Sequence, residues 1–197
     1  MDNSDPIYKY FVDNQYNLKD ATKKSREWFR QQTRLLAASQ VNAVKLMRDD
    51  PSALTNRPLI GRMYMFVYDP KHKATLPYYD IFPLVLPFRI ESDGFYGLNL
   101  HYLPVQQRVR LLGQLMKLAT TKNITENTRL RLSWATIEAT AKGAGITACV
   151  KHYLASQMGS QFKLISPPDW TLAAMMPVEG FAKAGKTRVW RESRGRL

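Results

Sequence analysis

The sequence predicts an α+β domain in which a small antiparallel β-meander packs on C-terminal helices, with a long N-terminal helix and extended arms. Three runs rich in aromatic and β-branched residues lie close together in the middle of the chain, at residues 62–69, 81–90 and 95–103. Apolar residues at helical spacing flank these runs on both sides. With 197 residues, 45% of them hydrophobic, the chain is long enough to bury one core.

The N-terminal segment is expected to attach the domain to something else. Residues 1–17 carry aromatic side chains without a helical or strand period, so we expect an arm that docks on another surface. Residues 18–48 place apolar side chains at helical spacing among lysines and arginines, which predicts a long helix. The Asp-Asp-Pro sequence at 49–51 ends it, because acidic groups oppose the dipole at a helix C-terminus and proline cannot continue a helix.

The three central runs predict the meander. The run "RMYMFVYD" (residues 62–69) is dense in residues that favour strands. The run "IFPLVLPFRI" (81–90) is almost wholly apolar, but its prolines cannot donate to a ladder, so we expect this strand at a sheet edge or broken. The run "FYGLNLHYL" (95–103) alternates and follows "ESDG", which predicts a hairpin turn.

The following part of the chain is predicted to be mostly helical. Pro104 is a favourable start for a helix over residues 105–119. Thr125 is a favourable N-cap for a second helix over residues 126–142, which "KGAG" ends. A third helix is predicted over residues 146–158.

The C-terminal part is predicted to contain a short strand, a short helix and a tail. The sequence "FKLI" (residues 162–165) predicts the strand, and Pro168 begins the helix. The final stretch, "KAGKTRVWRESRGRL", is basic and contains a single large aromatic residue. We therefore place an N-terminal arm and helix at residues 1–58, a core domain at 59–180 and a basic tail at 181–197.

The net charge of +13 is unevenly distributed along the chain. Residues 105–165 carry nine basic and two acidic side chains, whereas residues 59–104 carry four of each. Such an excess favours an acidic partner, either nucleic acid or an acidic protein, although solubility alone also explains it. The basic residues predicted to contact nucleic-acid phosphates are Arg108, Arg110, Lys117, Lys122, Arg129, Arg131, Lys142 and Lys151.

The aromatic residues that could stack on bases lie in the neutral segment, apart from the basic helices. Single-strand binders place stacking and charge together, so this separation counts against base recognition. The proline-stiffened stretch between Tyr68 and Phe88 suits a protein interface, or equally this domain's own core. The residues predicted to meet a partner are Tyr68, Tyr78, Tyr79, Phe82, Phe88 and Trp190.

The sequence predicts no enzyme, no metal and no cofactor. It contains no Walker loop, no G-x-G-x-x-G and no H-E-x-x-H motif. Cys149 and His152 have a spacing that would share one helix face, but no second pair of ligands accompanies them. Cys149 is the only cysteine, so an internal disulfide is excluded. No apolar run approaches the roughly 20 residues of a membrane span.

Four stretches carry a resemblance to a known group of proteins: "GRMYMFVYDPKHKATLPYYDIFPLVLPF", "GFYGLNLHYLP", "CVKHYL" and "KTRVWRESR". Over residues 61–194 they resemble a virion protein of large bacteriophages with contractile tails. The resemblance implies a non-enzymatic component of a tail, baseplate or neck, assembled in the host cytoplasm, that docks neighbouring virion proteins through its arms and aromatic face. Some relatives carry the label of DNA end protector, so the alternative is a protein that holds or protects the ends of packaged double-stranded DNA. The resemblance supplies no active-site residue and no small-molecule substrate.

Overall fold

A computed structural model describes residues 54–116, 130–133, 146–176 and 179–194, together with four single residues, Lys23, Glu27, Ala135 and Ile137. Its main sheet has six strands in the order β1-β7-β2-β4-β5-β6, and every neighbouring pair is antiparallel. The strands are β1 (Leu54–Thr55), β2 (Met63–Met65), β4 (Leu84–Ile90), β5 (Gly94–Asn99), β6 (Val150–Leu154) and β7 (Phe162–Ile165). A separate ribbon pairs β3 (Tyr79–Asp80) with β8 (Phe181–Ala182).

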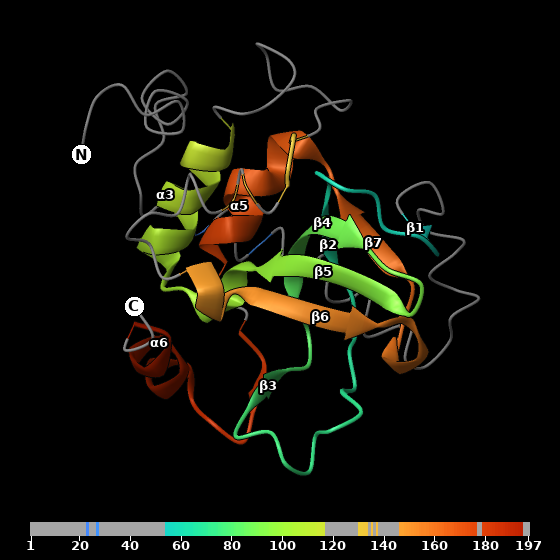
Figure 1. The fold of residues 1–197 in the computed structure, drawn as a ribbon. Coiled ribbons are helices and arrows are strands. Elements are labelled where there is room, and N and C mark those ends of the chain that lie inside the picture. The colour runs from blue at the N-terminus through green and yellow to red at the C-terminus, as the bar shows by residue number, and fades with distance from the viewer. Residues whose placement is uncertain are drawn as a thin grey trace.

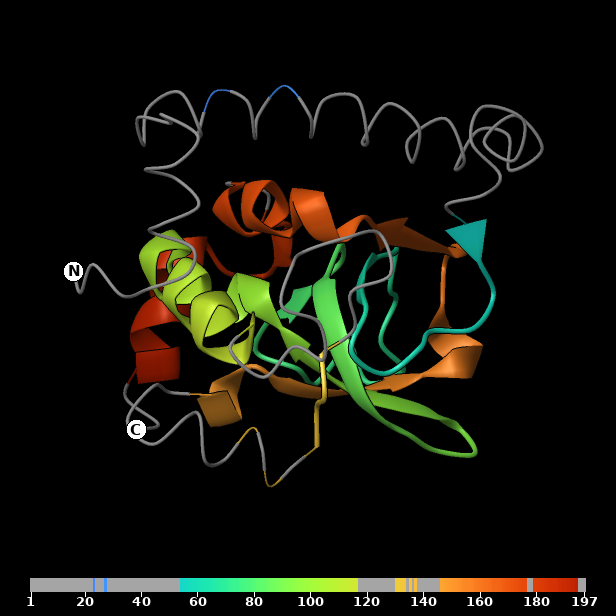
Figure 2. The same ribbon diagram turned by 90° about the horizontal axis from the view of Figure 1, so that it is seen from above.

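Helices accompany the sheet, so the predicted α+β class is confirmed. The described α-helices are α3 (Val105–Met116), α5 (Trp170–Met175) and α6 (Lys186–Arg194). Short 3₁₀ turns form η2 (Leu100–Tyr102), η3 (Ile146–Ala148), η4 (Ala155–Gln157) and η5 (Pro167–Asp169). Figures 1 and 2 show α3 and α5 next to each other, with α6 at the same end of the molecule as α3. None of the described helices is both long and apolar enough to cross a bilayer.

The sheet separates two hydrophobic cores. On one face, leucines of α3 and Trp170 of α5 pack against side chains such as Leu86 and Leu98 of the central strands. On the other face, Phe66 lies at the centre of an aromatic cluster, with ring centroids of Phe162 and Tyr153 at 4.9 and 5.2 Å. Because both faces are covered, the residues of β2 and most of β4 are buried, which explains why these runs are almost wholly apolar.

The central meander is present, but β4 is not an edge strand. It lies between β2 and β5, so the predicted edge position is wrong. Two features allow a proline here. The register with β5 shifts between Pro87 and Arg89, which is the break that the sequence predicts. On the other side, the pairing of β2 with β4 covers Leu84 and Val85 and does not extend to Pro87, so no ladder bond is lost. The Pro87 carbonyl still accepts a hydrogen bond from the Gly61 N–H at 3.0 Å.

The helix predicted over residues 146–158 is wrong. This segment forms η3, β6 and η4, and β6 pairs with β5 from Gly94 opposite Leu154 to Leu98 opposite Val150. Its sequence "VKHYL" contains β-branched and aromatic residues, which favour a strand. Pairing with the edge of β5 also satisfies its backbone hydrogen-bonding groups, so the segment forms a strand although its apolar residues have helical spacing. The prediction of β7 over residues 162–165 and of a short helix near Pro168 is confirmed.

Residues 179–194 pack onto the rest of the fold. β8 pairs with β3, and Val189 of α6 is fully buried. The indole N–H of Trp190 donates to the His101 carbonyl at 2.9 Å, which ties α6 to η2. The described part of the predicted tail is therefore integrated into the domain.

Several predicted segments lie outside the described residues. These are the arm at 1–17 and most of the helices predicted at 18–48 and 126–142. Within them the structure describes Lys23, Glu27, Ala135 and Ile137, all four in helical conformation, and also residues 130–133, which are not helical. The helix predicted over 126–142 is therefore wrong at residues 130–133, where Leu130 forms a β-bridge and its N–H donates to the Gly61 carbonyl.

Candidate nucleic-acid interface

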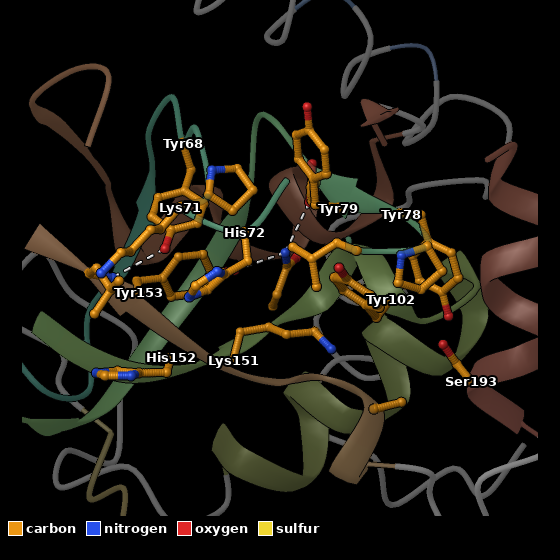
Figure 3. A pocket seen from close by; sticks show the side chains of 17 residues that line it. Tyr68, Lys71, His72, Tyr78, Tyr79, Tyr102, Lys151, His152, Tyr153 and Ser193 are labelled. Atoms are coloured by element: carbon orange, nitrogen blue, oxygen red, sulfur yellow. Dashed lines mark hydrogen bonds between the residues drawn. The ribbon is translucent and has the colours of Figure 1, made fainter. Parts of the chain in front are cut away.

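A cavity of about 560 Å³ lies beside the β3–β8 ribbon. Its walls come from the loop that precedes β3, from η2, from β6 and from α6, segments that are far apart in the sequence (Figure 3). Three other polar side chains, Asp80, Asn99 and Ser193, also line it. The lining residues that carry an aromatic ring or a basic group are Tyr68, Lys71, His72, Tyr78, Tyr79, Tyr102, Lys151, His152 and Tyr153.

Strand β6 is what brings charge to the aromatic residues. Side chains alternate along a strand, so Lys151 and Tyr153 point to the same face of the sheet. The Lys151 ammonium lies 3.9 Å from the centroid of the Tyr102 ring, a cation–π contact that Figure 3 shows from the side of the cavity. The sequence predicts that basic and aromatic residues lie apart, and this prediction is wrong at this site. It places Lys151 in a helix, whereas Lys151 belongs to strand β6.

The loop before β3 forms the rim of the cavity and is anchored from the C-terminal segment. It carries Lys71 and His72, both exposed. The Lys183 ammonium donates to the carbonyls of Ala74 and Leu76 at 2.9 and 3.1 Å, and it also contacts the carbonyl of Lys73. One side chain thus caps three backbone acceptors, which fixes the loop that presents the basic groups of the rim.

A buried polar network borders the cavity. Asp80 Oδ2 lies 2.8 Å from His101 Nδ1 and 3.0 Å from the Asn99 amide nitrogen. The same amide nitrogen lies 3.0 Å from the Tyr153 hydroxyl. Burial acts to raise the pKa of Asp80, but the hydrogen bonds and the proximity of His101 outweigh it and lower the pKa of this carboxyl below its ordinary value.

The charge state of this network follows from the burial of its histidine. Burial lowers the pKa of His101 below its ordinary value, so the imidazole is neutral near pH 7. A neutral His101 with Asp80 ionised places the ring proton on Nδ1, where it is donated to the carboxylate. The site therefore has a negative charge beside Asn99 and positive charges at the rim and at Lys151.

Arg108 is not a surface residue. Its guanidinium is fully buried, donates to the carbonyls of Leu103 and Met176 at 2.7 and 2.9 Å, and pairs with the Glu179 carboxylate. Burial lowers its pKa to about 9, so it is still charged at neutral pH. The prediction that Arg108 faces an external phosphate is wrong for this fold, because its charge is matched inside the protein.

The structure describes only some of the other residues predicted to contact phosphates. Arg110 and Arg131 are exposed, and Lys151 is half-buried at the cavity. Four of the predicted residues lie outside the described part of the chain: Lys117, Lys122, Arg129 and Lys142.

The predicted aromatic partner face is mostly internal. Tyr68, Tyr78 and Phe88 are buried, and Phe82 packs partly buried against the core. Trp190 is half-buried and bonded to His101 through its indole nitrogen. Tyr79 is half-buried at the cavity. Of the two interpretations that the sequence left open for this stretch, the structure supports the domain's own core for most of these residues.

Sequence reasoning missed Lys71, His72 and His152 as cavity residues. The signal for the first two is the sequence "KHK" placed between two aromatic runs that must fold together. His152 stacks on the Tyr96 ring with centroids 4.4 Å apart, which is a contact between paired positions of β6 and β5. Cys149 is buried in the core, and no group of three His, Cys, Asp or Glu side chains among the described residues is placed to hold a metal.

Comparison with known proteins gives one family. A family model described as "Phage T4 terminal DNA protecting protein" matches residues 11–193, which includes most of the N-terminal segment that the resemblance did not cover. The resemblance to phage proteins labelled as DNA end protectors is thereby confirmed. No curated protein and no solved structure matches the chain.

Proposed function

The chain belongs to the family of the phage T4 terminal DNA protecting protein, and from this premise we propose that it binds the ends of linear double-stranded DNA and shields them by occupying them. Shielding of this kind needs no catalytic step, because a bound protein denies a nuclease access to the terminus. The observation that carries the proposal is the contact between Lys151 and Tyr102 in a cavity lined by further rings and basic groups. Proteins that bind single-stranded nucleic acid combine charge with stacking surfaces in this way, and the end of a duplex is where a base face is exposed for stacking.

The overall charge supplies attraction to the duplex without sequence preference. With a net charge of +13, the protein is drawn to the phosphate backbone, and exposed groups such as Arg110 and Arg131 are available for contact. Affinity should therefore fall steeply as salt concentration rises, because binding releases counterions from the DNA. Arg108 does not contribute to this contact surface, since it is buried.

The test compares open and closed DNA of the same sequence. A short duplex with two free ends competes with a dumbbell in which hairpins close both ends, and binding is measured at two salt concentrations. We expect tighter binding to the open duplex, a loss of affinity with salt, and slower digestion of the bound ends by an exonuclease. Equal affinity for open and closed DNA, or no binding in dilute buffer, would overturn the proposal.

Two charge-matched variants locate the interface. Lys151→Gln removes one positive charge at the cavity, in edge strand β6, and should weaken binding to open ends. Arg57→Gln removes one exposed charge next to β1, at the opposite edge of the sheet, and serves as the control. If both variants lose affinity equally, the protein binds DNA through its general charge and the cavity has no special part.

A structural role in the virion is the second candidate. Under this hypothesis the protein is assembled in the host cytoplasm and docks onto neighbouring subunits of a tail, baseplate or neck. Among the described residues, three large apolar side chains stay exposed, Leu59, Ile81 and Ile90, at 52%, 43% and 49%, and these side chains are the candidate contacts for a neighbouring subunit. Replacing Leu59 and Ile90 by serine should reduce incorporation into particles while leaving DNA-end binding intact, and normal incorporation would count against this role.

A further inference from the structure

We propose that the cavity takes up a single unpaired nucleotide from the DNA terminus, with its base against the tyrosine rings and its 5′-phosphate at the basic rim. This inference rests on the proposed binding of DNA ends.

The size of the cavity selects one nucleotide. A volume of about 560 Å³ is within the range of roughly 300–1,000 Å³ that single small ligands occupy. A paired duplex end is too large for a space of this volume, because its two strands are separated by about 12 Å across the major groove. A base that enters such a space must leave the stack, as it does in enzymes that flip their target base. The terminal nucleotide is the easiest to unpair, because it is stacked on one side only.

The rings suit any of the four bases. Tyr78 and Tyr102 are largely buried, so they present only a small part of each ring to the cavity that they line. Their centroids are 6.2 Å apart, and the Phe181 ring packs against Tyr102 with centroids 5.1 Å apart. Tyr79 is half-buried and adds a ring whose backbone is held by pairing of β3 with β8. Stacking on aromatic rings is tolerant of sequence, since every base has a π-face. A protein that holds a terminus by stacking therefore needs no particular terminal sequence.

The charges orient the nucleotide. Lys71 and His72 are exposed at the rim, and Lys151 reaches across to Tyr102 (Figure 3). Asp80 is ionised and repels a phosphate, so the phosphate is kept at the rim and the less polar base occupies the interior. Three further carboxylates lie close to lining residues, and each has a basic partner: Asp69 with Lys73 at 2.7 Å, Asp93 with His152 at 3.2 Å, and Glu192, which also bonds to Tyr78, with Arg188 at 2.8 Å.

The decisive experiment varies the DNA and leaves the protein unchanged. Open duplexes of one sequence carry a matched terminal pair, a mismatched terminal pair, or a terminal pair held together by an interstrand cross-link. We expect the mismatch to tighten binding several-fold and the cross-link to weaken it on the order of tenfold, because only the cross-link forbids unpairing. Removal of the 5′-phosphate should also weaken binding.

The outcomes separate this inference from the proposed function. If cross-linked and free ends bind equally well, and both bind better than the closed dumbbell, the protein recognises ends but takes up no nucleotide, and the inference is overturned. If all open ends bind no better than the dumbbell, the proposed function itself fails.

A matched pair of variants tests the stacking surface. Tyr79→Leu removes the ring and should reduce the difference between mismatched and cross-linked ends, whereas Tyr79→Phe keeps the ring and should preserve it. If both variants and the wild type show the same difference in affinity between mismatched and cross-linked ends, Tyr79 is excluded from the site. Unfolding curves serve as the control that each variant is folded.

Discussion

Replacing Glu179 by glutamine should destabilise the fold strongly. The Glu179 side chain is only 1% exposed and pairs with the fully buried guanidinium of Arg108. Glutamine preserves the size of the side chain and an oxygen that accepts a hydrogen bond, but it removes the negative charge. The variant therefore leaves a positive charge in the interior without an opposite charge beside it.

The magnitude follows from the surroundings of Arg108. Breaking a buried ion pair by removing one partner costs about 3–5 kcal/mol, because the remaining charge has lost its water without compensation. Arg108 keeps the carbonyls of Leu103 and Met176 as acceptors at 2.7 and 2.9 Å, so we expect a loss near the lower end, about 3 kcal/mol. Lys186, which is 3.7 Å from Glu179 and half-exposed, adds at most about 1 kcal/mol.

The assay is equilibrium unfolding in urea followed by tryptophan fluorescence, and the chain contains four tryptophans. Since small proteins unfold in urea with slopes of about 1–3 kcal/mol per molar, the midpoint should fall by about 1 M or more. The double variant Arg108→Met, Glu179→Gln removes both charges and should recover at least half of the lost stability. A shift of less than about 0.3 M, or a double variant less stable than Glu179→Gln, would refute the reasoning about the buried pair.

Three further predictions concern other parts of the described fold. Gly61→Ala should cost about 1–3 kcal/mol in a thermal unfolding experiment, because Gly61 has a φ of 77° and an added Cβ would lie 2.0 Å from the Leu130 carbonyl oxygen. Stability should fall as pH drops below about 6.5, because the lowered pKa of His101 lets the unfolded chain take up the proton first. His101→Gln should remove that part of the slope, which cannot exceed about 1.4 kcal/mol per pH unit. Burial raises the pKa of the Cys149 thiol to about 12, so a disulfide reagent at mildly alkaline pH should modify the urea-unfolded protein and spare the native one.

The centre of the sheet could be predicted from the sequence because its strands are local and buried. The runs that became β2, β4 and β5 are dense in strand-forming residues and adjacent in the chain, so pairing them as a meander needs no long-range information. For β4 the sequence predicts an edge strand or a broken one, and the structure shows the second, since the strand is central and its register with β5 shifts. The rule against proline in central strands assumes an unbroken ladder, and here Pro87 stands at a register shift.

The candidate site could not be predicted because it depends on one strand that pairs across the fold. The five residues of β6 are too few for periodicity to separate strand from helix, and only the free edge of β5 decides between them. Once that segment is a strand, Lys151 meets Tyr102, and charge and rings share one cavity. For Arg108 the prediction of an exposed phosphate contact is wrong, because the sequence shows the positive charge but not its partner. The Glu179 carboxylate pairs with the guanidinium and stabilises it in the interior.

The stretch between Tyr68 and Phe88 combines scaffold and site, and Asp80 lies at the boundary between them. Residues before Asp80 line the cavity, while Leu84 and the residues that follow it form β4 and enter the core. Asp80 joins the two halves, since its carboxylate accepts from the Phe82 N–H at 3.1 Å and from Asn99 at 3.0 Å. Exposed rim residues such as Lys71 make few internal contacts to lose, whereas truncating a buried ring such as Phe88 costs about 3–5 kcal/mol. We therefore expect binding and stability to be separable within this one stretch, so that substitutions at the rim test the proposed DNA affinity without unfolding the sheet on which the cavity is built.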